Sequence, residues 1–204
     1  PIDLEIAGNG PLQTWQGKLR SKYGTLLHWE AGIGAALTEA PVLAIDGIAE
    51  VRDPAAFAMP PVLGGGYRHA LEIRRDGDGR ITVQNIDITL ADRFSAAGSL
   101  AYEPENNAIG GNLDIRAMEG LSAIADGAVS WQEVFATIGI SGTADKPAAE
   151  IAANITGFDV PDILKADLAL DGQLSSIADG GYRLALTSDI HPESLPDPAL
   201  APLA

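Results

Sequence analysis

Few residues of this chain combine the types and spacing that metal binding requires. The sequence DGDG at residues 76–79 comes nearest, because it could form part of a calcium-binding loop. A calcium ion takes six to eight oxygen ligands, and no glutamate follows DGDG at the spacing that such a loop uses. Asp-Gly is also a favoured dipeptide of tight hairpin turns. We therefore interpret these residues as a turn between two strands and expect no metal site.

Candidate catalytic residues are equally scattered. The three histidines, His28, His69 and His191, lie in separate segments, and none has a neighbouring nucleophile or a second metal ligand at a suitable spacing. The chain has no cysteine, which removes thiolate nucleophiles, thiolate metal sites and disulfides. Its 28 acidic residues include no pair that the sequence singles out for acid–base chemistry. We expect neither an enzyme nor a cofactor.

The charge of the chain limits its partners. The formal net charge is −15 at pH 7, and a strongly negative protein repels phosphate backbones, so nucleic acid is not an expected partner. Lys18, Arg20 and Lys22 form one basic row on an alternating segment. The simplest interpretation of this row is a solvated strand face or a protected sheet edge, with an acidic partner or a lipid head group as the alternative.

The elements that carry these residues are predicted to be strands. Apolar and polar residues alternate with period two over residues 67–74, 94–102, 109–116 and 182–190, so each segment has one apolar face and one polar face. This pattern is typical of an antiparallel sheet. The alternation changes phase near Gln84 and Asn85, where we expect a β-bulge to return the second half of the strand to the same face.

Three stretches interrupt the alternation and are predicted to be short helical crossings, at residues 53–63, 118–127 and 192–204. In the first, Asp53 is placed as an N-cap and Pro54 as the first helical residue. The breaks divide the chain into approximate units of residues 1–52, 64–117 and 128–191, with about four strands between successive breaks. These short helical stretches are too small to cover the apolar faces of the strands. The sheet must therefore form a sandwich, a closed barrel or a trough with an apolar interior.

Three segments also carry a resemblance to a known family. They are LEIAGNGPLQTWQGKLRSKYG at residues 4–24, GRITVQNIDITLADRFSAAGSLAYEPENNAIGGNLDIRA at residues 79–117, and ISGTADKPAAEIAANI at residues 140–155. Their cadence of strand, Gly-Thr, Asp-x-Pro and strand resembles the periplasmic region of the TamB-like proteins, with the AsmA-like and bridge-like lipid-transfer proteins as wider relatives. The resemblance implies a mainly β fold, in which an elongated, curved antiparallel sheet forms a U-shaped groove with short helical crossings.

The resemblance also implies a function and a location. It predicts a fragment of a periplasmic conduit that assists outer-membrane biogenesis, within a protein anchored in the inner membrane outside this fragment. The expected partners are phospholipid or apolar client β-strands, and an outer-membrane TamA-like barrel subunit for the full-length protein. The groove would be lined by Leu71, Ile73, Leu100, Leu113, Ile115, Ile138, Ile140, Ile151, Ile155, Leu168, Leu170, Leu184 and Leu186.

Two other functions remain open at the level of sequence. The first is a structural or adhesive β-repeat stalk, which predicts a closed interior packed with side chains and no bound lipid. The second is a glycan-active β-helix or β-barrel enzyme, which predicts several carboxylates with shifted pKa values in one cleft. Lipid that purifies with the protein would separate the conduit from both alternatives.

Overall fold

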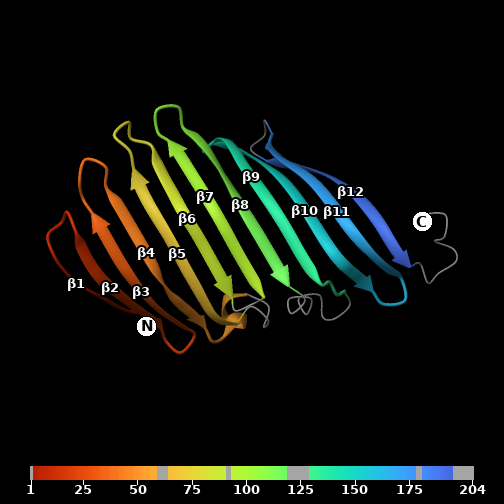
Figure 1. Cartoon of the computed structure of the whole chain (residues 1–204), viewed down its shortest axis with the longest axis horizontal. Helices are drawn as coiled ribbons and strands as arrows, with labels where there is room; N and C mark the ends of the chain where they lie inside the picture. The colour runs from red at the N-terminus through yellow and green to blue at the C-terminus, as the bar shows by residue number, and fades with distance from the viewer. Residues whose placement is uncertain (1, 59–63, 91–92, 119–128, 178–180, 195–204) are drawn as a thin grey trace.

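The chain forms one antiparallel β-sheet in which every strand pairs with its neighbours in the sequence. The computed structural model describes residues 2–58, 64–90, 93–118, 129–177 and 181–194. Within them the sheet has 12 strands in the order β1 to β12, so β1 and β12 are its two edges (Figure 1). The sheet does not close on itself, so the sandwich and the closed barrel are wrong, and the prediction of a mainly β, elongated and curved antiparallel sheet is confirmed.

The strands are eight to fifteen residues long and follow the alternating segments. Before the first interruption they are β1 (Ile2–Asn9), β2 (Trp15–Tyr23), β3 (Leu27–Ala36) and β4 (Val42–Val51). The next four are β5 (Gly65–Arg75), β6 (Ile81–Leu90), β7 (Phe94–Glu103) and β8 (Ala108–Met118). The last four are β9 (Glu133–Thr143), β10 (Lys146–Val160), β11 (Leu164–Ser176) and β12 (Tyr182–Ser194). The interruptions therefore separate three groups of four strands.

Turns and bulges lie where the local chemistry favours them. The expected turn at residues 76–79 joins β5 to β6, and its Gly79 has a φ of 87°, in the region that favours glycine. The expected bulge in β6 is also present, since the register with β7 shifts between Val83 and Ile86 and Asn85 has a φ of 53°. β10 has a second bulge, where the register with β11 shifts between Ile155 and Phe158.

The helical crossings are only partly as expected. Residues Pro54–Phe57 form one turn of 3₁₀ helix (η1), and the Asp53 carboxylate accepts a hydrogen bond from the Ala56 N–H at 3.4 Å, as an N-cap does. The rest of the first crossing after residue 58 and all of the second after Met118 lie outside the described residues.

The prediction of a helical crossing from residue 192 is wrong at its start, because β12 continues to Ser194. The physical reason is the position of β12 at the edge of the sheet, where Pro192 is tolerated although it has no N–H. Residues 195–204 lie outside the described part of the chain.

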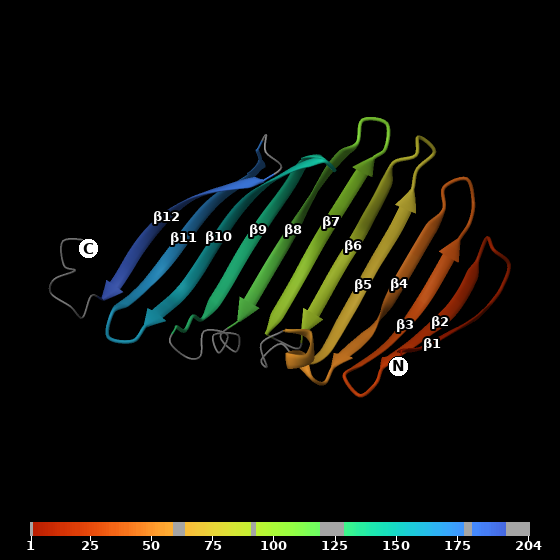
Figure 2. The same ribbon diagram turned by 180° about the vertical axis from the view of Figure 1, so that it is seen from behind.

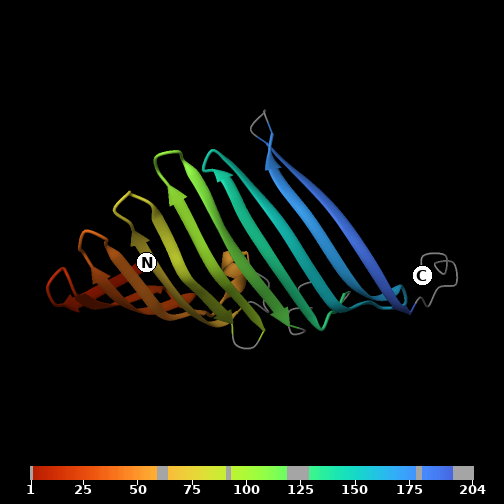
Figure 3. The ribbon, with the colours of Figure 1, turned by 45° about the horizontal axis from the view of Figure 1, so that its top comes forward.

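No second layer packs on this sheet within the described residues. Figures 1 and 2 view the sheet from opposite sides, and Figure 3 shows that it is twisted and curved rather than flat. Among the described residues, three apolar residues are buried, namely Ala31, Leu90 and Ala166. Most other apolar side chains are half-buried by their neighbours on the same face, so the usual core between two layers is missing from the part of the chain described.

Candidate functional site: the apolar face of the sheet

The strand register assigns every paired residue to one of two faces, because residues directly opposite each other in neighbouring strands point to the same side. One row of opposed residues crosses all twelve strands and is almost entirely apolar: Leu4, Ser21, Trp29, Ala49, Tyr67, Leu90, Phe94, Ala117, Val134, Ile155, Leu168 and Ile190. We call the side of the sheet that carries this row the apolar face.

The opposite side, which we call the polar face, has a different composition. One of its rows runs through Ala7, Lys18, Gly32, Asp46, Ala70, Asp87, Ala97, Asp114, Thr137, Ala152, Asp171 and Thr187. Among the paired strand residues, every Asp, Glu and Lys lies on the polar face. One arginine of these residues, Arg75 at the end of β5, lies on the apolar face. The two faces are therefore as different as the inside and outside of an ordinary protein, although no described segment covers either of them.

The register places all the residues predicted to line a groove on the apolar face. They come from β5 and from β7 to β12, and several are directly opposed, as Leu113 is to Ile138 and Ile138 is to Ile151. In β12, Leu184 and Leu186 are 53% and 62% exposed, because among the described strands this one has a neighbour on one side only.

The prediction left out β1 to β4 and β6, which extend the apolar face to the other edge of the sheet. Their contribution includes Ile6, Trp29, Ile33, Ile45 and Ile88. The signal that could have found part of this set is present in the sequence, since apolar residues alternate in Ile2–Asn9 and Leu27–Ala36 as they do later in the chain.

A polar contact on the apolar face joins Trp29 of β3 to His69 of β5. The indole N–H of Trp29 donates a hydrogen bond to Nε2 of His69, and the two rings meet edge to face with centroids 5.7 Å apart. Because Nε2 is the acceptor, the neutral imidazole carries its proton on Nδ1, and this atom is buried without a hydrogen-bond partner. Burial also raises the pKa of the neighbouring Tyr67 phenol, in the same strand and on the same face.

Ion pairs on the polar face are exposed. They join neighbouring strands, as Arg116 and Glu133 do at 2.8 Å, or near neighbours along the chain, as Arg52 and Glu50 do at 2.8 Å. The hydrogen bond from Arg52 holds the pKa of the Glu50 carboxyl below its ordinary value. Exposed pairs of this kind contribute little to stability, so the polar face serves mainly to keep one side of the sheet in water.

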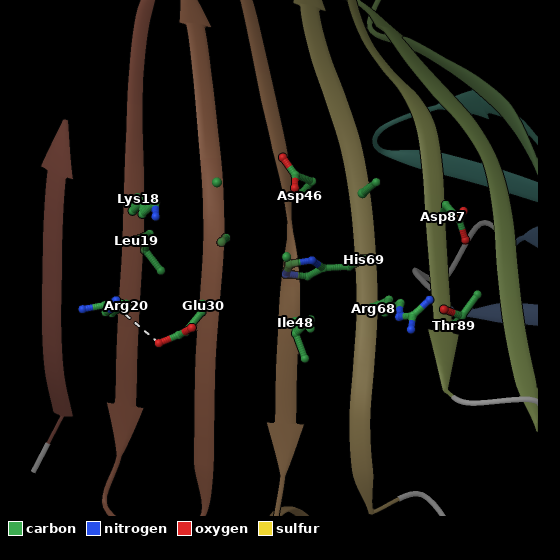
Figure 4. A pocket seen from close by; sticks show the side chains of 14 residues that line it. Lys18, Leu19, Arg20, Glu30, Asp46, Ile48, Arg68, His69, Asp87 and Thr89 are labelled. Carbon is green, nitrogen blue, oxygen red and sulfur yellow. Dashed lines mark ion pairs between the residues drawn. The ribbon is translucent and has the colours of Figure 1, made fainter. Parts of the chain in front are cut away.

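Hollows on the polar face arise where small residues lie between longer ones. A hollow of about 770 Å³ extends from β2 to β6, with Lys18, Arg20 and Arg68 among the basic residues around it (Figure 4). Glu30, which pairs with Arg20 at 3.3 Å, and Asp46 contribute charges of the opposite sign. Because charges of both signs surround the hollow, it favours neither an anionic nor a cationic ligand. The described residues contain no group of three or more His, Cys, Asp or Glu side chains placed to bind a metal ion.

These features define a class of protein by shape: an open, single-layer antiparallel β-meander with one apolar face and one polar face. Comparison of the chain with protein-family models, with curated proteins and with solved structures finds no match. Within the described residues no helix is both long and apolar enough to cross a bilayer.

Proposed function

We propose that the chain is a segment of a hydrophobic conduit that shields phospholipid acyl chains as they cross an aqueous space. In the setting that the sequence resemblance implies, this space is the periplasm, and the conduit assists outer-membrane biogenesis together with an outer-membrane barrel subunit. The supporting observation is the apolar face itself, which runs without interruption through all twelve strands and has no covering layer among the described residues.

The size of the face supports this proposal. Twelve strands spaced about 4.8 Å apart give a width of roughly 53 Å, and strands of ten residues at about 3.3 Å each give a length of roughly 33 Å. The largest apolar patch of an ordinary monomeric protein covers about 300–600 Å². A face with dimensions of this order is several times larger and would aggregate in water unless something covered it.

An acyl chain is a suitable cover for such a face. Half of a bilayer core is about 15 Å thick, so one extended tail laid across the strands spans roughly three strand spacings. Each methylene removed from water gains about 0.8 kcal/mol, so a tail that is mostly shielded gains on the order of 10 kcal/mol before ordering costs. Binding of this kind depends on apolar area and not on specific hydrogen bonds, in agreement with the mainly apolar composition of this face in the described strands.

The two alternative functions have less support. A stalk with a dry, closed interior needs a second layer or a closed sheet, and the described strands form one open layer. An enzyme of the β-helix or β-barrel type needs a closed or coiled architecture and a cleft with perturbed carboxylates. The pKa of Glu50 is lowered by an exposed ion pair with Arg52, two residues further along the chain, which is a local effect and not a catalytic cleft.

Lipid that purifies with the protein provides the test. The protein is expressed in a bacterial host, purified without detergent, and extracted with organic solvent, and phospholipid in the extract is quantified per chain. We expect phospholipid that remains through size-exclusion chromatography and that is replaced by added fluorescent phospholipid. Absence of lipid in the purified protein, together with no uptake of fluorescent phospholipid, would contradict the conduit.

A further inference from the structure

Arg75, the last residue of β5, brings a positive charge to the apolar face. It lies directly opposite Ile81 of β6, and Ile81 lies opposite Tyr102 of β7, so the three side chains share one row of this face. Every Asp, Glu and Lys of the paired strand residues lies on the polar face. Arg75 thus combines a fixed positive charge with an apolar surface, and this combination suits a ligand that has both an anionic and an apolar part.

The guanidinium of Arg75 forms no ion pair or hydrogen bond with another described residue. Arg74, its neighbour in the chain, differs in both respects, because it lies on the polar face and pairs with Glu72 at 3.0 Å. The side chain of Arg75 is exposed, so its N–H groups are accessible to a ligand. Two adjacent arginines therefore differ in the face that they occupy and in the partner that they have.

Arg75 lies where the apolar face ends along the direction of the strands. The turn at residues 76–79 follows it directly and joins β5 to β6. Figure 1 shows this turn at the upper end of the sheet, beside the hairpins that join β3 to β4 and β7 to β8. A phospholipid has a matching division, because its apolar tails end at an anionic phosphate. A lipid that covered the apolar face with its tails could therefore place its phosphate at Arg75.

We propose that Arg75 binds the phosphate of a phospholipid whose tails lie on the apolar face. A guanidinium presents its N–H donors in a planar fork that forms two parallel hydrogen bonds to phosphate oxygens. This inference rests on the proposed conduit, because it requires tails on the face, and it adds a contact for the part of the lipid that an apolar surface does not bind. It assigns the conduit a preference for lipids with a phosphate head group over neutral lipids.

The apolar residues beside Arg75 provide a surface for the tails. Its row continues through Ile81 and Tyr102 to Ile109 of β8. Three strand spacings of about 4.8 Å make this distance roughly 14 Å, close to the half-thickness of about 15 Å of a bilayer core. The next row inward is apolar across the same four strands: Ile73, Val83, Leu100 and Gly111. A tail laid across β5 to β8 therefore stays on apolar side chains along its length.

The charges around Arg75 set the size of the expected effect. The turn that follows contains Asp76, Asp78 and Arg80, a net charge of −1, which opposes a phosphate. Arg75 itself is exposed, and an exposed ion pair contributes little because water and salt screen it. We therefore expect the phosphate contact to strengthen lipid binding by about two- to fivefold, with most of the affinity coming from the tails.

A comparison of two lipids tests the proposal. The purified chain is titrated with fluorescent phosphatidylglycerol and with fluorescent diacylglycerol, which has the same tails and no phosphate. Arg75→Gln should weaken binding of phosphatidylglycerol about two- to fivefold and leave binding of diacylglycerol unchanged. Arg74→Gln is the matched control, because it removes the same charge at the next residue but on the polar face. We expect it to bind both lipids as the original chain does, and Arg75→Lys to keep most of the affinity because it keeps the charge.

The results that would overturn the phosphate site differ from the result that would overturn the conduit. Unchanged binding of phosphatidylglycerol by Arg75→Gln, or equal weakening of both lipids, would show that Arg75 does not contact the phosphate. Equal weakening by Arg75→Gln and Arg74→Gln would indicate a general effect of net charge. In each of these cases lipid still binds, so the conduit stands and the phosphate site is wrong. Failure of the original chain to bind either lipid would overturn the conduit and this inference together.

Discussion

Leu113→Arg separates a lipid-facing residue from a core residue. Leu113 is half-buried on the apolar face of β8, opposite Gly98 on one side and Ile138 on the other. Full burial of a leucine is worth about 1.5–3 kcal/mol, so the loss of this half-buried side chain costs about 1 kcal/mol of folding stability. The aliphatic stem of arginine recovers part of this cost by covering the same surface while its charged head reaches water.

The effect on an acyl chain is larger than the effect on folding. An arginine in the middle of hydrocarbon costs about 2.5–3.5 kcal/mol, which corresponds to roughly 60- to 300-fold weaker lipid binding at most. Uptake of fluorescent phospholipid by the purified variant measures this loss, and the urea midpoint measures stability. The matched control is Asn112→Arg, which adds the same charge at the adjacent, exposed position of β8 on the polar face.

The comparison between the two arginine variants shows whether Leu113 contacts lipid or belongs to a protein core. We expect Leu113→Arg to lose lipid with a nearly normal urea midpoint, and Asn112→Arg to keep both. If Leu113→Arg unfolds the protein, then the partner of Leu113 is protein, and the residue belongs to a dry core. Equal lipid uptake by both folded variants would refute the reasoning in a different way, by showing that lipid does not contact this part of the face.

Two further predictions concern the scaffold. Gly98→Ala would place a Cβ atom 2.1 Å from the carbonyl oxygen of Asn112, so we expect a loss of about 1–3 kcal/mol in the free energy of unfolding. The control Gly66→Ala, whose Cβ atom would meet no atom within 4 Å, should cost far less. Similar urea midpoints for the two variants would contradict the packing of β7 on β8. The Arg52 ion pair lowers the pKa of Glu50 below its ordinary value of 4.5, so its small stabilisation is complete above pH 4.5 and is lost as the pH falls through the lowered value. Arg52→Gln should return the pKa of Glu50 towards 4.5 in an NMR titration, and an unchanged pKa would show that the ion pair is not formed in solution.

Much of the strand arrangement could be predicted from the sequence because each strand carries its own local signal. Period-two alternation identified the strands around Leu71, Leu113 and Leu184, and the change of phase at Asn85 identified the bulge in β6. A continuous meander adds no long crossover, so pairing of neighbours in the sequence follows directly from these strands. Asp53 and Pro54 identified the turn of helix after β4 in the same local way.

Other features could not be predicted because they depend on neighbours. Pro192 was interpreted as the start of a helical crossing, since proline usually ends a strand, and only its place at the open edge of β12 explains why the strand continues. The sequence also could not decide between a closed and an open sheet, because an apolar row has the same pattern in both. The contact between Trp29 and His69, 40 residues apart in the chain, follows from the register of β3, β4 and β5 and has no local signal.

Photocrosslinking in cells tests the central claim most directly. A photoreactive amino acid is placed at Leu113 or Leu170 on the apolar face, and at Asp114 or Asp171 on the polar face as matched controls in the same strands. Cells are labelled with radioactive phosphate, irradiated, and the purified protein is examined for label. The account predicts crosslinked phospholipid at the two leucine positions and none at the aspartate positions. Absence of label at all four positions, or equal label on both faces, would contradict a lipid-facing apolar surface.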